Sequence, residues 1–164
     1  MFRANTSADS FARVLVPARG ASGDPTTSGG GGGGALLEIY NAAGTGEKVV
    51  IALPASGWFA EDGSPQPGGY RYVAHTRDDP VKRLAVRANH IRLRAGGASF
   101  AYTLDEPEQG AIALRLRLGT ALPWCASAPA KSGGSPPSTT LYDHVDRFIG
   151  ARNTPPPAIC PPLP

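Results

Sequence analysis

The chain has 164 residues with 16 basic and 13 acidic side chains, which gives a formal net charge of +3. Glycine (21) and proline (17) together are about twice as frequent as in an average protein, and this excludes a helix bundle, a coiled coil and a long helical repeat. The longest aliphatic run, 49–53, is far shorter than the roughly 20 residues of a membrane-spanning helix. We therefore expect one all-β domain with many turns.

The predicted elements follow a polar segment, 1–10, that we expect to be disordered. Segments in which apolar residues alternate with small or polar ones indicate strands; they are 11–16, 35–40, 48–53, 69–75, 83–87, 90–95, 98–104 and 111–118. Residues 18–34 end in six consecutive glycines and predict a flexible loop within the domain. Residues 54–69 are rich in proline and glycine and predict a second long loop.

The connection between 90–95 and 98–104 is the clearest local signal. Gly96 and Gly97 suit a two-residue hairpin turn, because glycine accepts a positive φ at both central positions. We therefore expect these two segments to pair directly. Strands separated by turns, without alternating helices, predict an antiparallel β-sandwich of about eight strands over 11–125, jelly-roll-like or immunoglobulin-like.

The remainder of the chain, 126–164, reads as a linker, a short helix and a proline-rich tail. The helix is predicted over 141–149, because Leu141, Val145 and Phe148 lie on one face at helical spacing and Gly150 follows as a stop signal. We expect this helix to pack on the sandwich.

The two cysteines, Cys125 and Cys160, fit neither a metal-ligand spacing nor a redox pair. A bridge between them would attach the proline-rich tail to the domain, and it would require an oxidising compartment; two free thiols are the alternative. Residues 1–7 lack the apolar segment of a signal peptide. The chain is therefore either cytoplasmic or starts at an internal Met1, and we favour the second, with a secreted or cell-surface location.

Motifs for catalysis and cofactor binding are missing from the sequence. Residues 44–49 lack the spacing of a phosphate-binding loop, and 20–24 do not form the G-x-S-x-G turn of a nucleophilic serine. No metal-ligand motif is present. We predict a non-enzyme without metal or cofactor. A hydrolase of unusual type stays open, because a triad assembled across the fold could use one of three histidines, His75, His90 or His144.

Arginine is the most distinctive feature of the predicted surface. Six arginines alternate with apolar residues: Arg83, Arg87, Arg92, Arg94, Arg115 and Arg117. If their strands are neighbours, these side chains share the solvent face of one sheet, where guanidinium groups bind carboxylates, sulfates or phosphates. The alternative is an ordinary solvated face in a protein from a GC-rich genome. No aromatic residues are interleaved for base stacking, which argues against nucleic acid.

A second candidate binding feature is aromatic. Trp58 lies in the predicted long loop, and an exposed Trp58 beside Tyr70 and Tyr72 would form a platform on which sugar rings stack. Together with the arginines, this platform would bind a glycan or another acidic polymer.

Several short segments, 37–41, 53–58, 102–107 and 122–125, together with the Cys160 tail, resemble Gly/Pro-rich secreted β-domain proteins of GC-rich bacteria. The resemblance covers 11–164, implies an exported β-rich module and assigns no site residue. We expect a non-catalytic extracellular or cell-surface module with a structural or adhesive role. A glycan- or acidic-polymer-binding module is the first alternative, and the hydrolase is the second.

Overall fold

The chain is all-β in the computed structural model, which describes residues 2–5, 21–27, 33–42, 46–62, 64, 67–87, 90–105, 108–120, 123–132, 143–144, 147–150 and 157–164. The strands are β1 (Phe2–Asn5), β2 (Ala35–Asn41), β3 (Lys48–Leu53), β4 (Trp58–Ala60), β5 (Gly69–Val73), β6 (Val81–Arg87), β7 (His90–Ala95), β8 (Ala111–Leu118), β9 (Trp124–Pro129), β10 (Asp143–His144) and β11 (Arg147–Phe148). One 3-10 helix, Ala55–Gly57, precedes β4. No helix within the described residues has the length and apolar character needed to cross a membrane.

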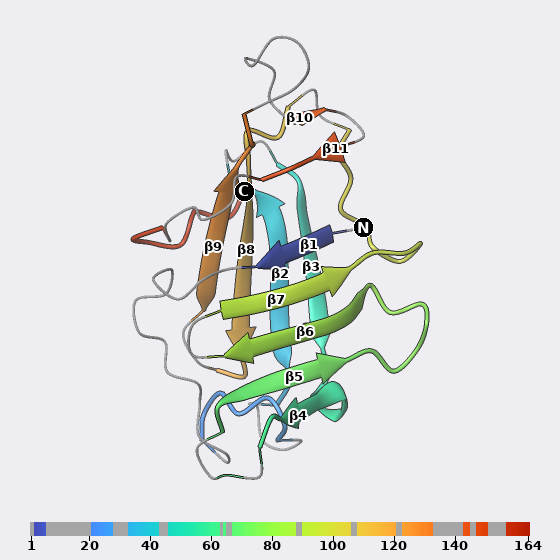
Figure 1. Cartoon of the computed structure of the whole chain (residues 1–164), viewed down its shortest axis with the longest axis vertical. Coiled ribbons are helices and arrows are strands. Elements are labelled where there is room, and N and C mark those ends of the chain that lie inside the picture. The colour runs from blue at the N-terminus through green and yellow to red at the C-terminus, as the bar shows by residue number, and fades with distance from the viewer. Residues whose placement is uncertain are drawn as a thin grey trace.

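The strands form two larger antiparallel sheets and one small pair. The five-stranded sheet has the order β1-β7-β6-β5-β4, the four-stranded sheet has the order β3-β2-β8-β9, and β10 pairs with β11. Figure 1 shows the five-stranded sheet in front of the four-stranded one, with the strands of the two sheets crossing steeply. Four consecutive strands, β4 to β7, stay in one sheet, whereas jelly rolls and immunoglobulin domains use Greek-key connections. The described strand order is therefore neither of the two that we predicted.

One hydrophobic core lies between the two sheets. Its fully buried side chains come from both of them, with Leu37 and Leu116 in the four-stranded sheet and Tyr70, Leu84 and Leu93 in the five-stranded sheet. Successive side chains of a strand point to opposite faces. Burial of these residues therefore turns their neighbours along each strand outward to solvent.

The hairpin predicted at Gly96 and Gly97 is not formed. Both glycines have the expected positive φ, 141° and 109°, but residues 98–104 are not a strand, and the backbone N–H of Phe100 donates to Gly97 in a tight turn. The reason is that β7 already has β6 on one side and β1 on the other. Both of its edges are occupied, so the chain after the turn leaves the sheet.

The strand β1 lies within the segment 1–10 that we predicted to be disordered. It pairs with β7 from Phe2 opposite Ala95 to Asn5 opposite Arg92. Residues 6–10 and the strand predicted over 11–16 lie outside the described residues, as do 18–20 and 28–32 of the predicted glycine-rich loop.

The helix predicted over 141–149 is wrong where the structure describes this segment, because β10 and β11 pair as antiparallel strands. A two-turn helix has little stability of its own, and long-range hydrogen bonds hold this segment extended. The buried carboxylate of Asp143 accepts the backbone N–H groups of Gln109 at 2.7 Å and Gly110 at 2.6 Å. At the other end, the N–H of Lys131 donates to the carbonyl of Ile149.

The predicted disulfide between Cys125 and Cys160 is confirmed, with their Cα atoms 5.4 Å apart. It attaches the proline-rich tail to β9, which is itself a strand that we had assigned mostly to the linker. The hydroxyl of the buried Tyr40 in β2 donates to the carbonyl of Pro161 at 2.8 Å. The described end of the tail, 157–164, is therefore held against the four-stranded sheet at two points.

Loss of the disulfide should destabilise the domain. The bridge closes a loop with a sequence separation of 35 residues, and Cys160→Ser should lower the free energy of unfolding by about 3–4 kcal/mol, because the denatured chain regains its entropy. Urea denaturation measures this difference. Wild-type protein unfolded with a reductant should match the variant; identical midpoints with and without reductant would contradict the structural role of the bridge.

Removal of the Asp143 carboxylate should also destabilise the fold. Asp143→Ala leaves two backbone N–H groups without their acceptor, at an expected cost of about 2–3 kcal/mol. The matched control is Asp78→Ala in an exposed turn, which should change stability by less than about 0.5 kcal/mol. Equal midpoints for the two variants in urea would show that Asp143 does not hold the β10–β11 segment.

Candidate functional site

The six predicted arginines do not share one face. Arg83 and Arg87 lie on β6 and Arg92 and Arg94 on β7, all exposed on the five-stranded sheet, whereas Arg115 and Arg117 lie on β8 of the other sheet. The two sheets bury their inner faces against each other, so their outer faces lie on opposite sides of the domain. Alternation along a strand had predicted that each arginine points outward, but it carries no information on which sheet a strand joins.

A fifth arginine joins the first four. Arg71 of β5 is exposed between the buried Tyr70 and Tyr72. Its register places it opposite Ala85 of β6, and Ala85 is opposite Arg92 of β7. We call the outer surface of the five-stranded sheet that carries Arg71, Arg83, Arg87, Arg92 and Arg94 the arginine face. The alternation in 69–75 could have revealed Arg71, since the same pattern turns Tyr70 and Tyr72 inward.

Acidic residues are missing from the strands of this sheet. The sequences of β1, β4, β5, β6 and β7 contain no Asp or Glu. Arg87 alone among the five has a carboxylate partner in the described part of the chain: its Nε lies 2.7 Å from Oε2 of Glu61 and its Nη2 lies 3.1 Å from Oε1. This hydrogen bond and the negative charge of Glu61 raise the pKa of Arg87.

Two arginines of this face are directly opposed. Arg83 of β6 and Arg94 of β7 are cross-strand partners, and like charges in that position destabilise a sheet. On the four-stranded sheet, by contrast, Arg115 lies opposite Glu38, with 3.6 Å between Nε and Oε2. The arginine face therefore carries positive charge that the described residues leave largely uncompensated.

An exposed aromatic ring lies at one edge of the arginine face. Phe59 of β4 is 48% exposed and is the cross-strand partner of Arg71. The guanidinium carbon of Arg71 lies over the ring, 5.8 Å from its centroid, which is within the range of a cation–π contact. Sequence reasoning missed Phe59 because β4 was assigned to a loop.

The predicted aromatic platform is wrong. Trp58, Tyr70 and Tyr72 are buried, with exposed fractions of 4%, 0% and 3%. The indole N–H of Trp58 donates to the carbonyl of Leu53 at 3.3 Å, and its ring lies 5.5 Å from that of Tyr72. Because β4 turns alternate side chains to opposite faces, Trp58 enters the core and its neighbour Phe59 faces solvent.

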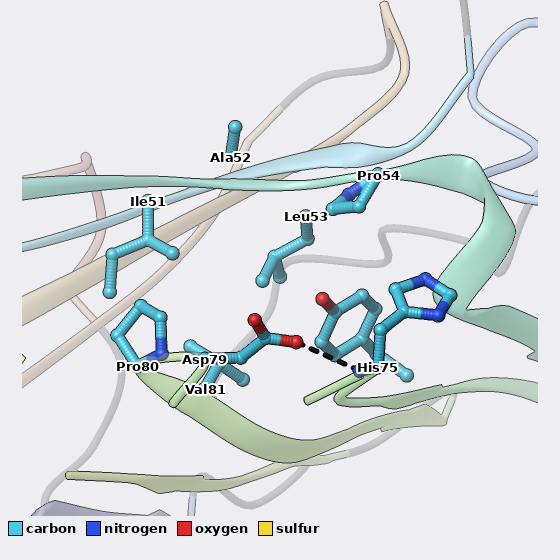
Figure 2. Close-up of a pocket in the computed structure, with 9 residues that line it drawn as sticks. Ile51, Ala52, Leu53, Pro54, His75, Asp79, Pro80 and Val81 are labelled. Atoms are coloured by element: carbon cyan, nitrogen blue, oxygen red, sulfur yellow. Dashed lines mark hydrogen bonds between the residues drawn. The ribbon is translucent and has the colours of Figure 1, made fainter. Parts of the chain in front are cut away.

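A small pocket of about 140 Å³ lies where β3 approaches the loop after β5 (Figure 2). Its lining residues are Ile51, Ala52, Leu53, Pro54, Tyr72, His75, Asp79, Pro80 and Val81. One carboxylate oxygen of Asp79 accepts the backbone N–H groups of His75 at 2.8 Å and Thr76 at 3.1 Å, and the other accepts the Thr76 hydroxyl at 2.8 Å. These bonds, the Thr76 hydroxyl first, lower the pKa of Asp79. Burial, followed by the charge of Asp79, raises the pKa of Tyr72.

A hydroxyl–imidazole pair lies beside this pocket. The exposed Ser56 and His75 place Oγ 3.0 Å from Nε2. In a serine-nucleophile triad the acid binds the other imidazole nitrogen. Here Asp79 binds the backbone N–H of His75, and Figure 2 shows the imidazole ring turned away from the carboxylate. Ser56, His75 and Asp79 are therefore close together but do not form a triad. Ser56 contacts the imidazole of His75, whereas Asp79 binds only the backbone N–H of His75.

Two of the three histidines considered for a catalytic triad cannot be placed in a site. His90 and His144 lie in β7 and β10, and their side chains are outside the described residues. In the part of the chain that the structure describes, no three His, Cys, Asp or Glu side chains gather as a metal site would require.

Comparison with known proteins gives no family for this chain. No protein-family model matches its sequence, no curated protein matches it, and no solved structure matches its fold. The resemblance of 11–164 to secreted Gly/Pro-rich proteins stays a prediction.

The Thr76 hydroxyl should hold down the pKa of Asp79. Thr76→Val should raise this pKa toward its ordinary value, whereas Thr76→Ser should keep it low. Since the carboxylate has a lowered pKa in the folded state, its contribution to the 74–80 loop is present above about pH 4 and is lost as the pH falls through the folded pKa. A carbon-13 NMR titration of the Asp79 carboxyl measures it; equal pKa values in wild type and Thr76→Val would contradict the assignment.

Proposed function

We propose that this chain is a non-catalytic β-sandwich module of an oxidising compartment, with an adhesive role in which the arginine face binds an anionic polymer. The Cys125–Cys160 disulfide supports the oxidising compartment and an exported location. The two sheets over one core support the sandwich.

The distribution of charge is the observation that carries this proposal. A compositional preference for arginine would place basic and acidic residues on both sheets alike. Instead, the five-stranded sheet has arginines in four adjacent strands, β1, β7, β6 and β5, and no acid in any strand, while Arg115 of the other sheet faces Glu38. Guanidinium groups bind carboxylates, sulfates and phosphates through two parallel hydrogen bonds. A ligand of repeated anionic groups would offset the repulsion between Arg83 and Arg94.

A hydrolase is the second candidate, favoured only by the contact between Ser56 and His75. An activated serine should react with a fluorophosphonate probe, and Ser56→Ala should abolish the labelling. We expect no labelling above that of Ser56→Ala, because the imidazole lacks an orienting acid among the described residues. Labelling at Ser56 that requires His75 would overturn the non-catalytic proposal.

Binding of a polyanion should depend on which face loses charge. The double variant Arg83→Gln/Arg92→Gln should weaken binding to dextran sulfate at least about tenfold, as expected for two lost ionic contacts. The control Lys48→Gln/Arg117→Gln removes the same charge from exposed positions of the other sheet and should change the affinity less than about threefold. Calorimetry at fixed salt measures both. Equal losses would mean that net charge alone matters, and no binding by the wild type would refute the proposed function.

A further inference from the structure

The residues of one row across the five-stranded sheet alternate in character. By register, Arg92 of β7 lies opposite Ala85 of β6, Ala85 lies opposite Arg71 of β5, and Arg71 lies opposite Phe59 of β4. From β7 to β4 the row therefore contains a cation, a small residue, a second cation and an aromatic ring. Neighbouring strands are roughly 4.8 Å apart, so the two arginines are roughly 10 Å apart, with the ring one strand beyond.

This spacing selects among anionic polymers. A ligand that crosses the strands along this row meets a cation at every second strand and only the methyl group of Ala85 between them. A chain with an anionic group on alternate units, and a bulkier neutral unit between, matches that pattern. The second arginine pair, Arg83 opposite Arg94, lies on the same face one step away along both strands, where it can reach a neighbouring anionic group.

The edge of the face favours a sugar ring over a nucleobase. Nucleic-acid platforms stack successive bases on successive aromatic rings, whereas Phe59 is the single aromatic residue exposed in the described part of this sheet. The guanidinium of Arg71 already lies over its ring. A base would have to displace Arg71, while a sugar unit can place its apolar C–H groups against the uncovered part of the ring and its anionic group on Arg71.

We propose that the ligand of the arginine face is an acidic polysaccharide, with carboxylate or sulfate groups on alternate sugar units, that crosses β7, β6 and β5 and ends with a sugar ring against Phe59. This inference rests on the proposed function and specifies its ligand. Ala85 is a specificity-determining position, because it leaves the space through which the neutral unit passes between Arg92 and Arg71.

The test uses the full chain and four probes with equal numbers of negative charges. These are a glycan with uronate on alternate units, a glycan with sulfate on alternate units, poly-glutamate and oligo(dT). Fluorescence anisotropy should show that one of the two glycans binds at least about threefold more tightly than the other polymers, and the better glycan identifies the anionic group.

Variants separate the ring from the charge. Phe59→Ala should weaken glycan binding about three- to tenfold and change poly-glutamate binding less than twofold or so. Ala85→Glu should abolish glycan binding, because a carboxylate between Arg71 and Arg92 neutralises and blocks the row, whereas Ala85→Ser should bind as wild type does. Unchanged unfolding midpoints verify that each variant folds. If Phe59→Ala does not fold, Phe59→Leu takes its place in the test.

Each other outcome counts against the inference in a distinct way. Tightest binding to oligo(dT), lost in Phe59→Ala, would assign the face to single-stranded nucleic acid. Equal binding of all four probes, insensitive to Phe59→Ala, would leave a general polyanion surface, so that the proposed function holds and the polysaccharide does not. Binding of none of the probes would refute both.

Discussion

The burial of one face of each sheet in a single shared core is the constraint on which the rest of the structure depends. Leu37, Leu84 and Leu93 have no solvent exposure or almost none, and the two-residue period of a strand then turns their neighbours outward. The same rule buries Trp58 and exposes Phe59, and it buries Tyr70 and exposes Arg71. The arginine face is thus the outer side of the pattern that builds the core, and no separate element is needed to form it.

Two polar or covalent ties hold the C-terminal part of the chain to this core. The disulfide joins the tail to β9, and Asp143 binds the backbone N–H groups of Gln109 and Gly110, immediately before β8. Around Asp143 the buried polar groups satisfy each other, since the hydroxyl of Tyr102 donates to Gln109 at 2.8 Å. Both ties are on the side of the four-stranded sheet, so neither of these two described contacts covers the arginine face.

The sequence was sufficient where alternation and long apolar segments determine the structure. Strands near 35–40, 48–53, 83–87, 90–95 and 111–118 were predicted close to their observed positions, and the tail chemistry led to the correct disulfide. The sequence was insufficient where the structure of a segment depends on its contacts with residues far away in the chain. The strand expected at 98–104 is excluded because β1 occupies its place beside β7. The helix expected at 141–149 does not form, because Asp143 binds Gln109 and Gly110 and Ile149 binds Lys131. The strand β9 forms along the edge of β8, although its sequence is rich in Ala and Ser. For the site, alternation predicted that the arginines are exposed. Only the order of the strands shows that Arg92 and Arg117 lie on different sheets.

The most direct test of this account is amide chemical-shift mapping of isotope-labelled protein during titration with a short glycan carrying an acidic group on alternate units. The arginine face predicts that the largest shifts lie along the row through Arg92, Ala85, Arg71 and Phe59 and that Arg115 and Arg117 on the opposite sheet are unaffected. Shifts centred on β8 and β2, or spread evenly over both sheets, would contradict the claim that this face is the binding surface.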